Sequence, residues 1–132
     1  MARIATLVGS TGVGSYHVGI KDLGGYEQRA TFQFDCNSPF FAEVLATNNF
    51  DFVTNVGSNW INVTDRIFKD QGQDDPDFVQ VSGSRQYRRA AKAGNIVAAG
   101  IYAMDAGFFP AAFQVNVTSV TSGDPLGIFF GV

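Results

Sequence analysis

The sequence of 132 residues is poor in the residue types that build most metal sites and crosslinks. It has one cysteine, Cys36, so an internal disulfide and a zinc site made of cysteines are excluded. It has one histidine, His17, so a metal site with several histidines is excluded as well. No apolar run approaches the roughly 18 residues that a membrane-spanning helix needs. We therefore expect a fold stabilised by apolar burial, and no membrane partner.

Charged residues are also few. Nine Lys and Arg against twelve Asp and Glu give a formal net charge of −3, whereas a nucleic-acid-binding protein usually carries a basic face. One basic cluster surrounds an aromatic residue, an arrangement that also occurs in proteins that bind single strands. We favour pairing of this cluster with the acidic loop before it, in the same chain or a neighbouring one, and we expect no nucleic-acid partner. The cluster consists of Arg85, Arg88, Arg89 and Lys92, with Tyr87 inside it.

The first 15 residues contain one Arg and few apolar residues before Gly and Ser predominate. The apolar run of this stretch is too short to form the core of a secretory signal peptide. We expect a protein that stays where it is made or leaves by another route, such as release within a virus particle. The expected location is a virion or another extracellular particle.

Phenylalanine and glycine are abundant, with 13 and 15 residues, and hydrophobic residues make up 45% of the chain. That fraction is typical of a globular domain. Several segments alternate apolar and polar residues with a period of two, which is the pattern of a strand with one buried face. In residues 29–36, for example, Phe32, Phe34 and Cys36 share one face. We predict an all-β fold, an antiparallel β-sandwich or jelly roll of about eight short strands with at most one short helix.

The clearest pair of strands lies in residues 94–120, which we interpret as a hairpin. Ile101 and Ala103 alternate with their neighbours, and the same alternation returns from Phe113 to Val117, with Gly107 in the connection. Two further apolar segments, separated by Gly, Ser and Asn, are expected to form a second hairpin. The other expected elements are strands at 3–8, 40–46 (or a short helical turn there) and 78–81, the second hairpin at 50–56 and 60–65, and the one candidate helix at 84–93, for which loop and strand are the alternatives.

Two segments carry a family resemblance. YEQRATFQFD begins at Tyr26, and AAGIYAMDAGFFPAAFQVNVTSV ends the expected first hairpin. They resemble the strands that open and close the bacterial pre-peptidase C-terminal domain, over about residues 26–120. The resemblance implies sandwich architecture, and it implies that the family's acidic pair corresponds to Asp75 and Asp77. The matching positions are Tyr26, Phe32 and Phe34 in the first segment, and Gly100, Tyr102, Phe113, Val115 and Val117 in the second.

Residues 9–14, GSTGVG, follow an apolar segment, as phosphate-binding loops do. Such a loop needs a helix directly behind it, and the Walker pattern needs a Lys after the last glycine. Here Ser15 follows Gly14, and further glycines prevent a helix. We interpret residues 9–19 as a flexible arm that orders on a partner. Its His17 has no nucleophile elbow beside it, so we interpret it as a surface or interface histidine and predict no enzymatic activity.

Four aspartates cluster within residues 70–77, and closely spaced oxygen ligands suit Ca²⁺. The EF-hand spacing is absent, so a solvated acidic loop is the alternative that we favour. The candidate calcium ligands are Asp74, Asp75 and Asp77, and we expect no other cofactor. Trp60, the one tryptophan, is interpreted as a core residue, with a platform for a sugar ring as the alternative.

The last nine residues, DPLGIFFGV, are apolar after the first two. Exposed apolar termini pair with other chains, and burial of each large side chain contributes roughly 1.5–3 kcal/mol. We expect this tail and the N-terminal arm to contact neighbouring copies in a symmetric homo-oligomer. The expected interface residues are Leu126, Ile128, Phe129, Phe130 and Val132.

These patterns predict assembly rather than catalysis. We divide the chain into a strand and Gly-rich arm (1–25), a β-sandwich domain (26–122) and an apolar C-terminal tail (123–132). We expect a structural protein that assembles as a homo-oligomer on or in a larger particle, such as a phage capsid decoration or a virion subunit. The alternatives are a calcium- or carbohydrate-binding module, which would use the aspartate loop and Trp60, and a surface filament subunit.

Overall fold

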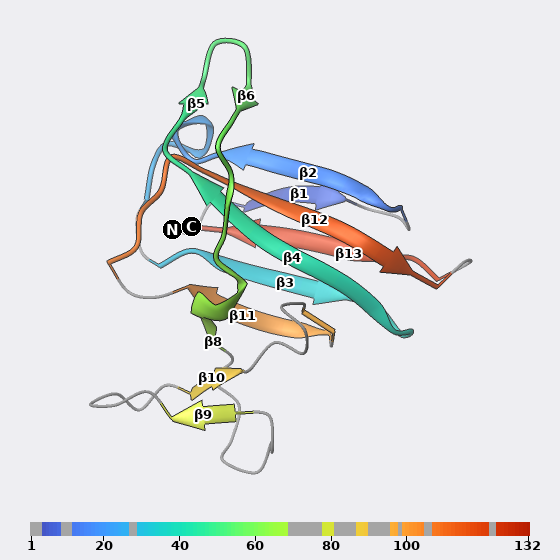
Figure 1. Ribbon diagram of the computed structural model, residues 1–132. Coiled ribbons are helices and arrows are strands. Elements are labelled where there is room, and N and C mark those ends of the chain that lie inside the picture. Colours follow the sequence, from blue (N-terminus) through green and yellow to red (C-terminus); the bar gives the residue numbers. More distant parts are fainter. Residues whose placement is uncertain are drawn as a thin grey trace.

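The computed structural model describes residues 4–8, 12–26, 29–68, 78–80, 87–89, 96–97, 99–104, 107–121 and 124–132. These residues form two antiparallel sheets that pack face to face as a β-sandwich (Figure 1). Four strands of each sheet face one another, and the described residues contain two short 3₁₀ helices and no α-helix. The predicted fold class is confirmed.

The first sheet has the strand order β1-β13-β3-β11, extended at one side by three short strands, and the second sheet has the order β2-β12-β4-β7. A small β5–β6 hairpin projects from the end of the sandwich (Figure 1). The first sheet comprises β1 (Ile4–Val8), β13 (Gly127–Gly131), β3 (Thr31–Asp35), β11 (Gly100–Met104), β8 (Ile67–Phe68), β10 (Tyr87–Arg89) and β9 (Phe78–Gln80). The remaining elements are β2 (Gly14–Gly19), β12 (Ala112–Val120), β4 (Phe40–Thr47), β7 (Ile61–Asn62), β5 (Phe50–Asp51), β6 (Val56–Gly57), η1 (Lys21–Leu23) and η2 (Thr64–Arg66).

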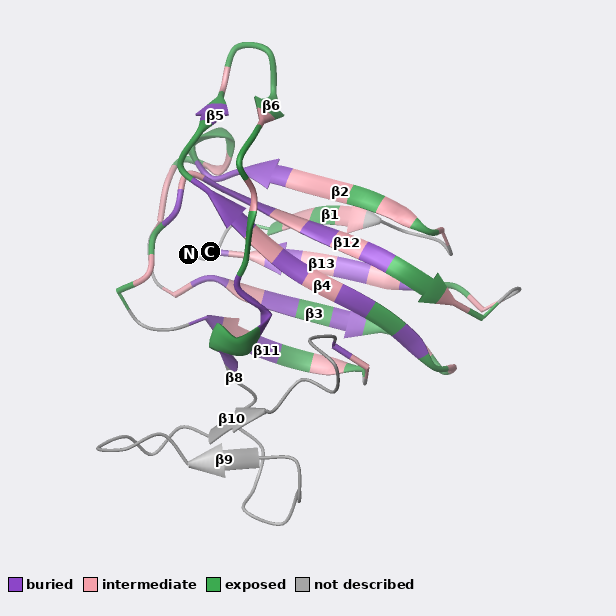
Figure 2. Ribbon diagram, in the orientation of Figure 1, coloured by how far each residue is buried: buried purple, intermediate pink, exposed green. Residues whose placement is uncertain are grey.

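The core lies between the two sheets, and buried residues alternate with more exposed ones along the long strands (Figure 2). Phe32 on β3 packs edge-to-face against Phe113 on β12, with ring centroids 5.3 Å apart. Phe130 on β13 packs against Phe32 at 5.0 Å and against Phe113 at 5.5 Å. Because β12 belongs to the opposite sheet, these three fully buried rings connect the two layers.

Both terminal segments belong to the sandwich itself. Strand β13 lies between β1 and β3, and β2 pairs with β12, so the described strands of the predicted arm and tail belong to the two sheets. The flexible-arm interpretation is wrong for β2. The prediction that other copies cover the tail is wrong for Leu126, Ile128, Phe130 and Val132, because these side chains are at most 2% exposed within their own chain. Among the predicted interface residues, Phe129 alone faces away from the core.

Strands β11 and β12 form where alternation predicts them, but they do not pair with each other. Strand β11 pairs with β3 and β8 in the first sheet, and β12 pairs with β2 and β4 in the second. The connection at residues 107–111 therefore crosses from one layer to the other, and the predicted hairpin over residues 94–120 is wrong. The alternation correctly predicts which face of each strand is buried. The two buried faces pack against the same core from opposite sheets.

The predicted turn of the second hairpin is also displaced. The chain reverses at residues 52–55, between β5 and β6, and β7 pairs instead with β4. The Asp51 carboxylate accepts hydrogen bonds from the backbone amides of Val53 (2.9 Å) and Thr54 (3.3 Å), and these bonds lower the pKa of Asp51. Asn55 closes the turn with a left-handed backbone at φ 58°. An Asp side chain that binds the next amides thus sets the turn.

The remaining uncertain elements are strands. Residues 40–46, for which a helical turn was the alternative, lie within β4. Residues 87–89, inside the candidate helix, form β10, so the helix interpretation is wrong there. The expected strand at 78–81 corresponds to β9.

Candidate functional site

Over its four long strands, the outer face of the first sheet carries one charged residue, Asp35. We use "outer face" for the residues of β1, β13, β3 and β11 that point away from the core. Three large apolar side chains stand on it: Ile4 and Ile101, which are 70% and 59% exposed, and Phe129, which is half-buried. The outer face consists of Ile4, Thr6, Thr31, Gln33, Asp35, Ile101, Ala103, Gly127, Phe129 and Gly131.

The register places these residues in two rows across four strands. Thr6, Phe129, Gln33 and Ile101 are direct neighbours in one row, and Ile4, Gly131, Thr31 and Ala103 are neighbours in the next. The glycine has no side chain, so the larger neighbours surround a shallow hollow of about 160 Å³. The outer face thus has both projecting apolar side chains and a hollow that is lined largely by apolar residues.

The outer face of the second sheet carries more polar side chains, although Phe41 and Leu45 of β4 also lie on it and Phe41 is 46% exposed. Asn116 on β12 lies between Ser15 and Glu43, and the Ser15 hydroxyl donates a hydrogen bond to its side chain at 3.1 Å. Gln114 lies between His17 and Leu45 in the next row. Amides, a hydroxyl and a carboxylate on this face suit contact with water. The outer face of the second sheet is therefore the more polar of the two.

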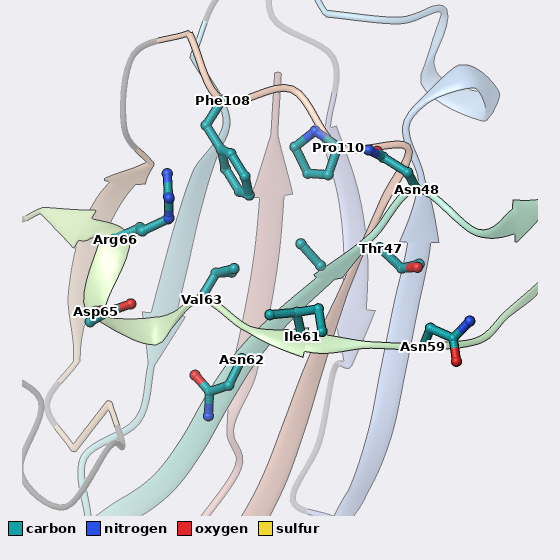
Figure 3. Close-up of a pocket in the computed structure, with 11 residues that line it drawn as sticks. Thr47, Asn48, Asn59, Ile61, Asn62, Val63, Asp65, Arg66, Phe108 and Pro110 are labelled. Atoms are coloured by element: carbon teal, nitrogen blue, oxygen red, sulfur yellow. The ribbon is translucent and has the colours of Figure 1, made fainter.

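A pocket of about 430 Å³ lies at the side of the sandwich, where residues 107–111 pass from one layer to the other. Figure 3 shows Phe108 and Pro110 on one side and Ile61 on β7 opposite them. Arg66 and Asp65 of η2 stand at one end, and Asn48 and Asn59 at the other (Figure 3). The walls are thus apolar in the middle and polar at both ends. The remaining lining residues are Ala46, Thr47, Asn62 and Val63.

Several contacts fix the walls of this pocket. The Arg66 guanidinium lies over the Phe108 ring, 4.7 Å from its centroid. The amide of Ala111 donates to the Asn48 side-chain oxygen at 3.0 Å. The Tyr26 hydroxyl donates to the backbone oxygen of Pro110 at 2.8 Å, and burial raises the pKa of Tyr26. These bonds hold residues 107–111 in place on the two layers.

His17 and Trp60 lie together at the base of the β5–β6 hairpin. The His17 ring packs against Phe50 and Trp60, with centroids 5.8 and 6.2 Å away, and its Nε2 atom is 2.9 Å from the backbone oxygen of Asn55. Trp60 also packs on Gly57, where a side chain would collide with the indole ring. Both residues therefore support the hairpin, and Trp60 belongs to an aromatic cluster at the end of the sandwich.

The predicted calcium ligands Asp74, Asp75 and Asp77 lie outside the described residues, as do Arg85 and Lys92 of the basic cluster. Within the described ranges, no group of three His, Cys, Asp or Glu side chains is placed to hold a metal ion. No helix in those same ranges is long and apolar enough to cross a membrane.

The outer face and the pocket were not identified from the sequence. The signal for the outer face was the lack of charge at alternate positions of four strands, which becomes visible only when the strand order is known. The pocket draws its residues from three separated segments, 46–48, 59–66 and 108–110. No sequence pattern connects these segments.

Comparison with known proteins gives no relative: no protein-family model, no curated protein and no solved structure matches the chain. The resemblance to the pre-peptidase C-terminal domain therefore depends on the quoted residues alone, and the functional argument must be made from the site itself.

Proposed function

We propose that the protein is a structural subunit that assembles through the outer face of its first sheet into a homo-oligomer, on or in a larger particle. A phage capsid decoration or another virion subunit is the kind of particle protein that we have in mind. The observation that carries the proposal is the outer face itself, which spans four strands and has Asp35 as its one charged residue. Exposed large apolar side chains that gather on one face are a feature of interaction sites.

A second copy of the chain is the occupant that the outer face fits best. Projecting side chains, Ile4, Ile101 and Phe129, and the hollow at Gly131 lie on the same surface. A two-fold axis brings the same surface of both subunits together, so projections of one copy can fill the hollow of the other. Two sheets pack well in this manner at about 10 Å with their strands rotated by about 30°.

The contrast between the two sheets supports this orientation. The fully buried centre of a protein interface is more apolar than the rest of the surface. The outer face of the first sheet carries Ile4, Ile101 and Phe129, whereas the second sheet presents mostly polar side chains, among them Ser15, Gln114 and Asn116, beside the apolar Phe41 and Leu45. The second sheet therefore faces solvent or the exterior of the particle in this proposal.

Introducing a charge into the outer face tests the proposal. The wild-type chain of 14.2 kDa is expected to elute as a dimer or larger oligomer in size-exclusion chromatography with light scattering. Ile101→Arg and Phe129→Arg are expected to give monomers, because an unpaired guanidinium would be buried at the contact. Gln114→Arg, at an outward position of β12 in the other sheet, is the matched control and should keep the wild-type mass.

Circular dichroism must show that the variants are folded, which the exposure of Ile101 favours. A wild-type protein that is monomeric at micromolar concentration would contradict the proposal. Folded Arg variants that retain the wild-type mass would show that any oligomer uses another surface.

A further inference from the structure

We infer that the pocket between β7 and residues 107–111 is a binding site for a neutral saccharide of one or two rings. This inference is independent of the proposed assembly, because the pocket lies at the side of the sandwich and shares no residue with the outer face. Its volume, about 430 Å³, lies within the range of roughly 300–1,000 Å³ that is usual for small-ligand sites.

The middle of the pocket offers apolar surface on two opposite sides. Phe108 and Pro110 stand on one side and Ile61 on the other (Figure 3). Ile61 is 65% exposed, so apolar surface lies open to solvent at this point. A pyranose ring presents apolar C–H groups on its faces, and these can pack on rings and aliphatic side chains without desolvating a hydroxyl group.

The two ends of the pocket offer unused hydrogen-bonding groups. The Asn59 side-chain amide and the Asp65 carboxylate make no hydrogen bond with any described residue, and Asn48 uses its oxygen but not its amide nitrogen within that part of the chain. Together they provide donors and acceptors. Sugar hydroxyls both donate and accept, so a saccharide satisfies both kinds of group.

The backbone at Asn59 directs one of these groups. Asn59 has a left-handed backbone with φ 56°, a conformation that costs least for glycine but is tolerated by Asn. The residue that follows, Trp60, is held by Phe50 and by Gly57. Asn59 is therefore presented at the end of the pocket from a fixed turn rather than from a free loop.

Other small ligands match the pocket less well. An anion would meet the Asp65 carboxylate, and the Arg66 guanidinium is already stacked on Phe108. A wholly apolar ligand would cover the amides of Asn48 and Asn59 without replacing their hydrogen bonds to water, which costs free energy. A short peptide offers donors and acceptors as well, and the experiment must separate it from a sugar.

Titration of the ¹⁵N-labelled protein with defined probes, followed by NMR, tests the inference. The probes are maltose, cellobiose, lactose and diacetylchitobiose, and a glycine–alanine tripeptide that has amides but no hydroxyl groups. At least one disaccharide is expected to shift the side-chain amides of Asn48 and Asn59 with a millimolar dissociation constant. Asn59→Gly keeps the left-handed backbone and removes the amide, so it should weaken binding by about fivefold or more.

Asn55→Gly is the matched control, because Asn55 has the same backbone conformation at φ 58° but lies on the β5–β6 turn outside the pocket. It should bind like the wild type. The inference is overturned if no disaccharide shifts the pocket residues, if the tripeptide shifts them and the sugars do not, or if Asn59→Gly binds the sugar as tightly as Asn55→Gly. A failure of this kind leaves the oligomer measured by light scattering unchanged, so the two proposals fail separately.

Discussion

Removal of residues 126–132 is expected to abolish folding rather than to release a monomer. The segment forms β13, which pairs with β1 on one side and with β3 on the other. Its loss would leave both neighbouring strands with unpaired backbone groups and would open the core between them. The terminal apolar residues are thus a central part of the first sheet.

The magnitude follows from the burial of four side chains. Leu126, Ile128 and Phe130 are 0% exposed and Val132 is 2% exposed. Each contributes roughly 1.5–3 kcal/mol on burial, so the four together contribute about 6–12 kcal/mol. The total stability of a domain is about 5–15 kcal/mol, so this loss is comparable to all of it.

The assay is circular dichroism with urea denaturation of the truncated chain. We expect no cooperative unfolding transition and exposure of apolar surface to a hydrophobic dye. Two point variants keep the test informative if the truncated chain aggregates. Phe130→Ala should lower the free energy of unfolding by about 3–5 kcal/mol, whereas Phe129→Ala, on the outer side of the same strand, should cost less than about 1.5 kcal/mol in the monomer. A truncated chain with a cooperative transition near that of the wild type would refute the reasoning.

Three further predictions concern the turn, the layer connection and the hairpin base. The pKa of Asp51 is lowered in the fold, so its stabilisation of the turn is present above the unfolded pKa of about 3.9 and is lost as the pH falls below it. Acid titration by NMR should shift the backbone amide signals of Val53 and Thr54, and Asp51→Asn should abolish these shifts. Tyr26→Phe removes the hydrogen bond to Pro110 and should cost about 0.5–1.5 kcal/mol in urea denaturation. Because burial raises the Tyr26 pKa, the free energy of unfolding of the wild type should fall as the pH rises above about 10. The Phe variant has no hydroxyl group to ionise and should not show this decrease. Gly57→Ala places a methyl group against the Trp60 ring and should destabilise the fold by about 1–3 kcal/mol; an unchanged midpoint would show that the aromatic cluster can rearrange.

Period-two alternation predicted the strands and their buried faces well. Phe32 and Phe34 on β3 and Phe113 on β12 are buried, as strands with one apolar face require. Alternation says nothing, however, about which strand is the hydrogen-bonding partner. The segments of β11 and β12 follow one another with Gly107 between them, and a hairpin has the same sequence pattern. The crossing from one layer to the other depends on the packing of the whole core.

Composition misled the interpretation of both ends of the chain. The glycines around β2 suggested flexibility, but Tyr16 and Val18 face the core and the strand pairs with β12 along its length. The apolar tail suggested contact with other subunits, although a central strand of a sandwich has the same composition. A local sequence cannot distinguish an apolar segment that is covered by its own chain from one that is covered by a neighbour.

The pairing of β1 with β13 has a practical consequence for work with this protein. Ile4 lies opposite Gly131, so the first and the last described strands run side by side at the border of the outer face. A bulky group attached close to Ile4 or Gly131 would lie beside the same surface and would compete sterically with a second subunit. A reporter group is better attached to a substituted side chain at Val53, which is 94% exposed at the tip of the projecting hairpin.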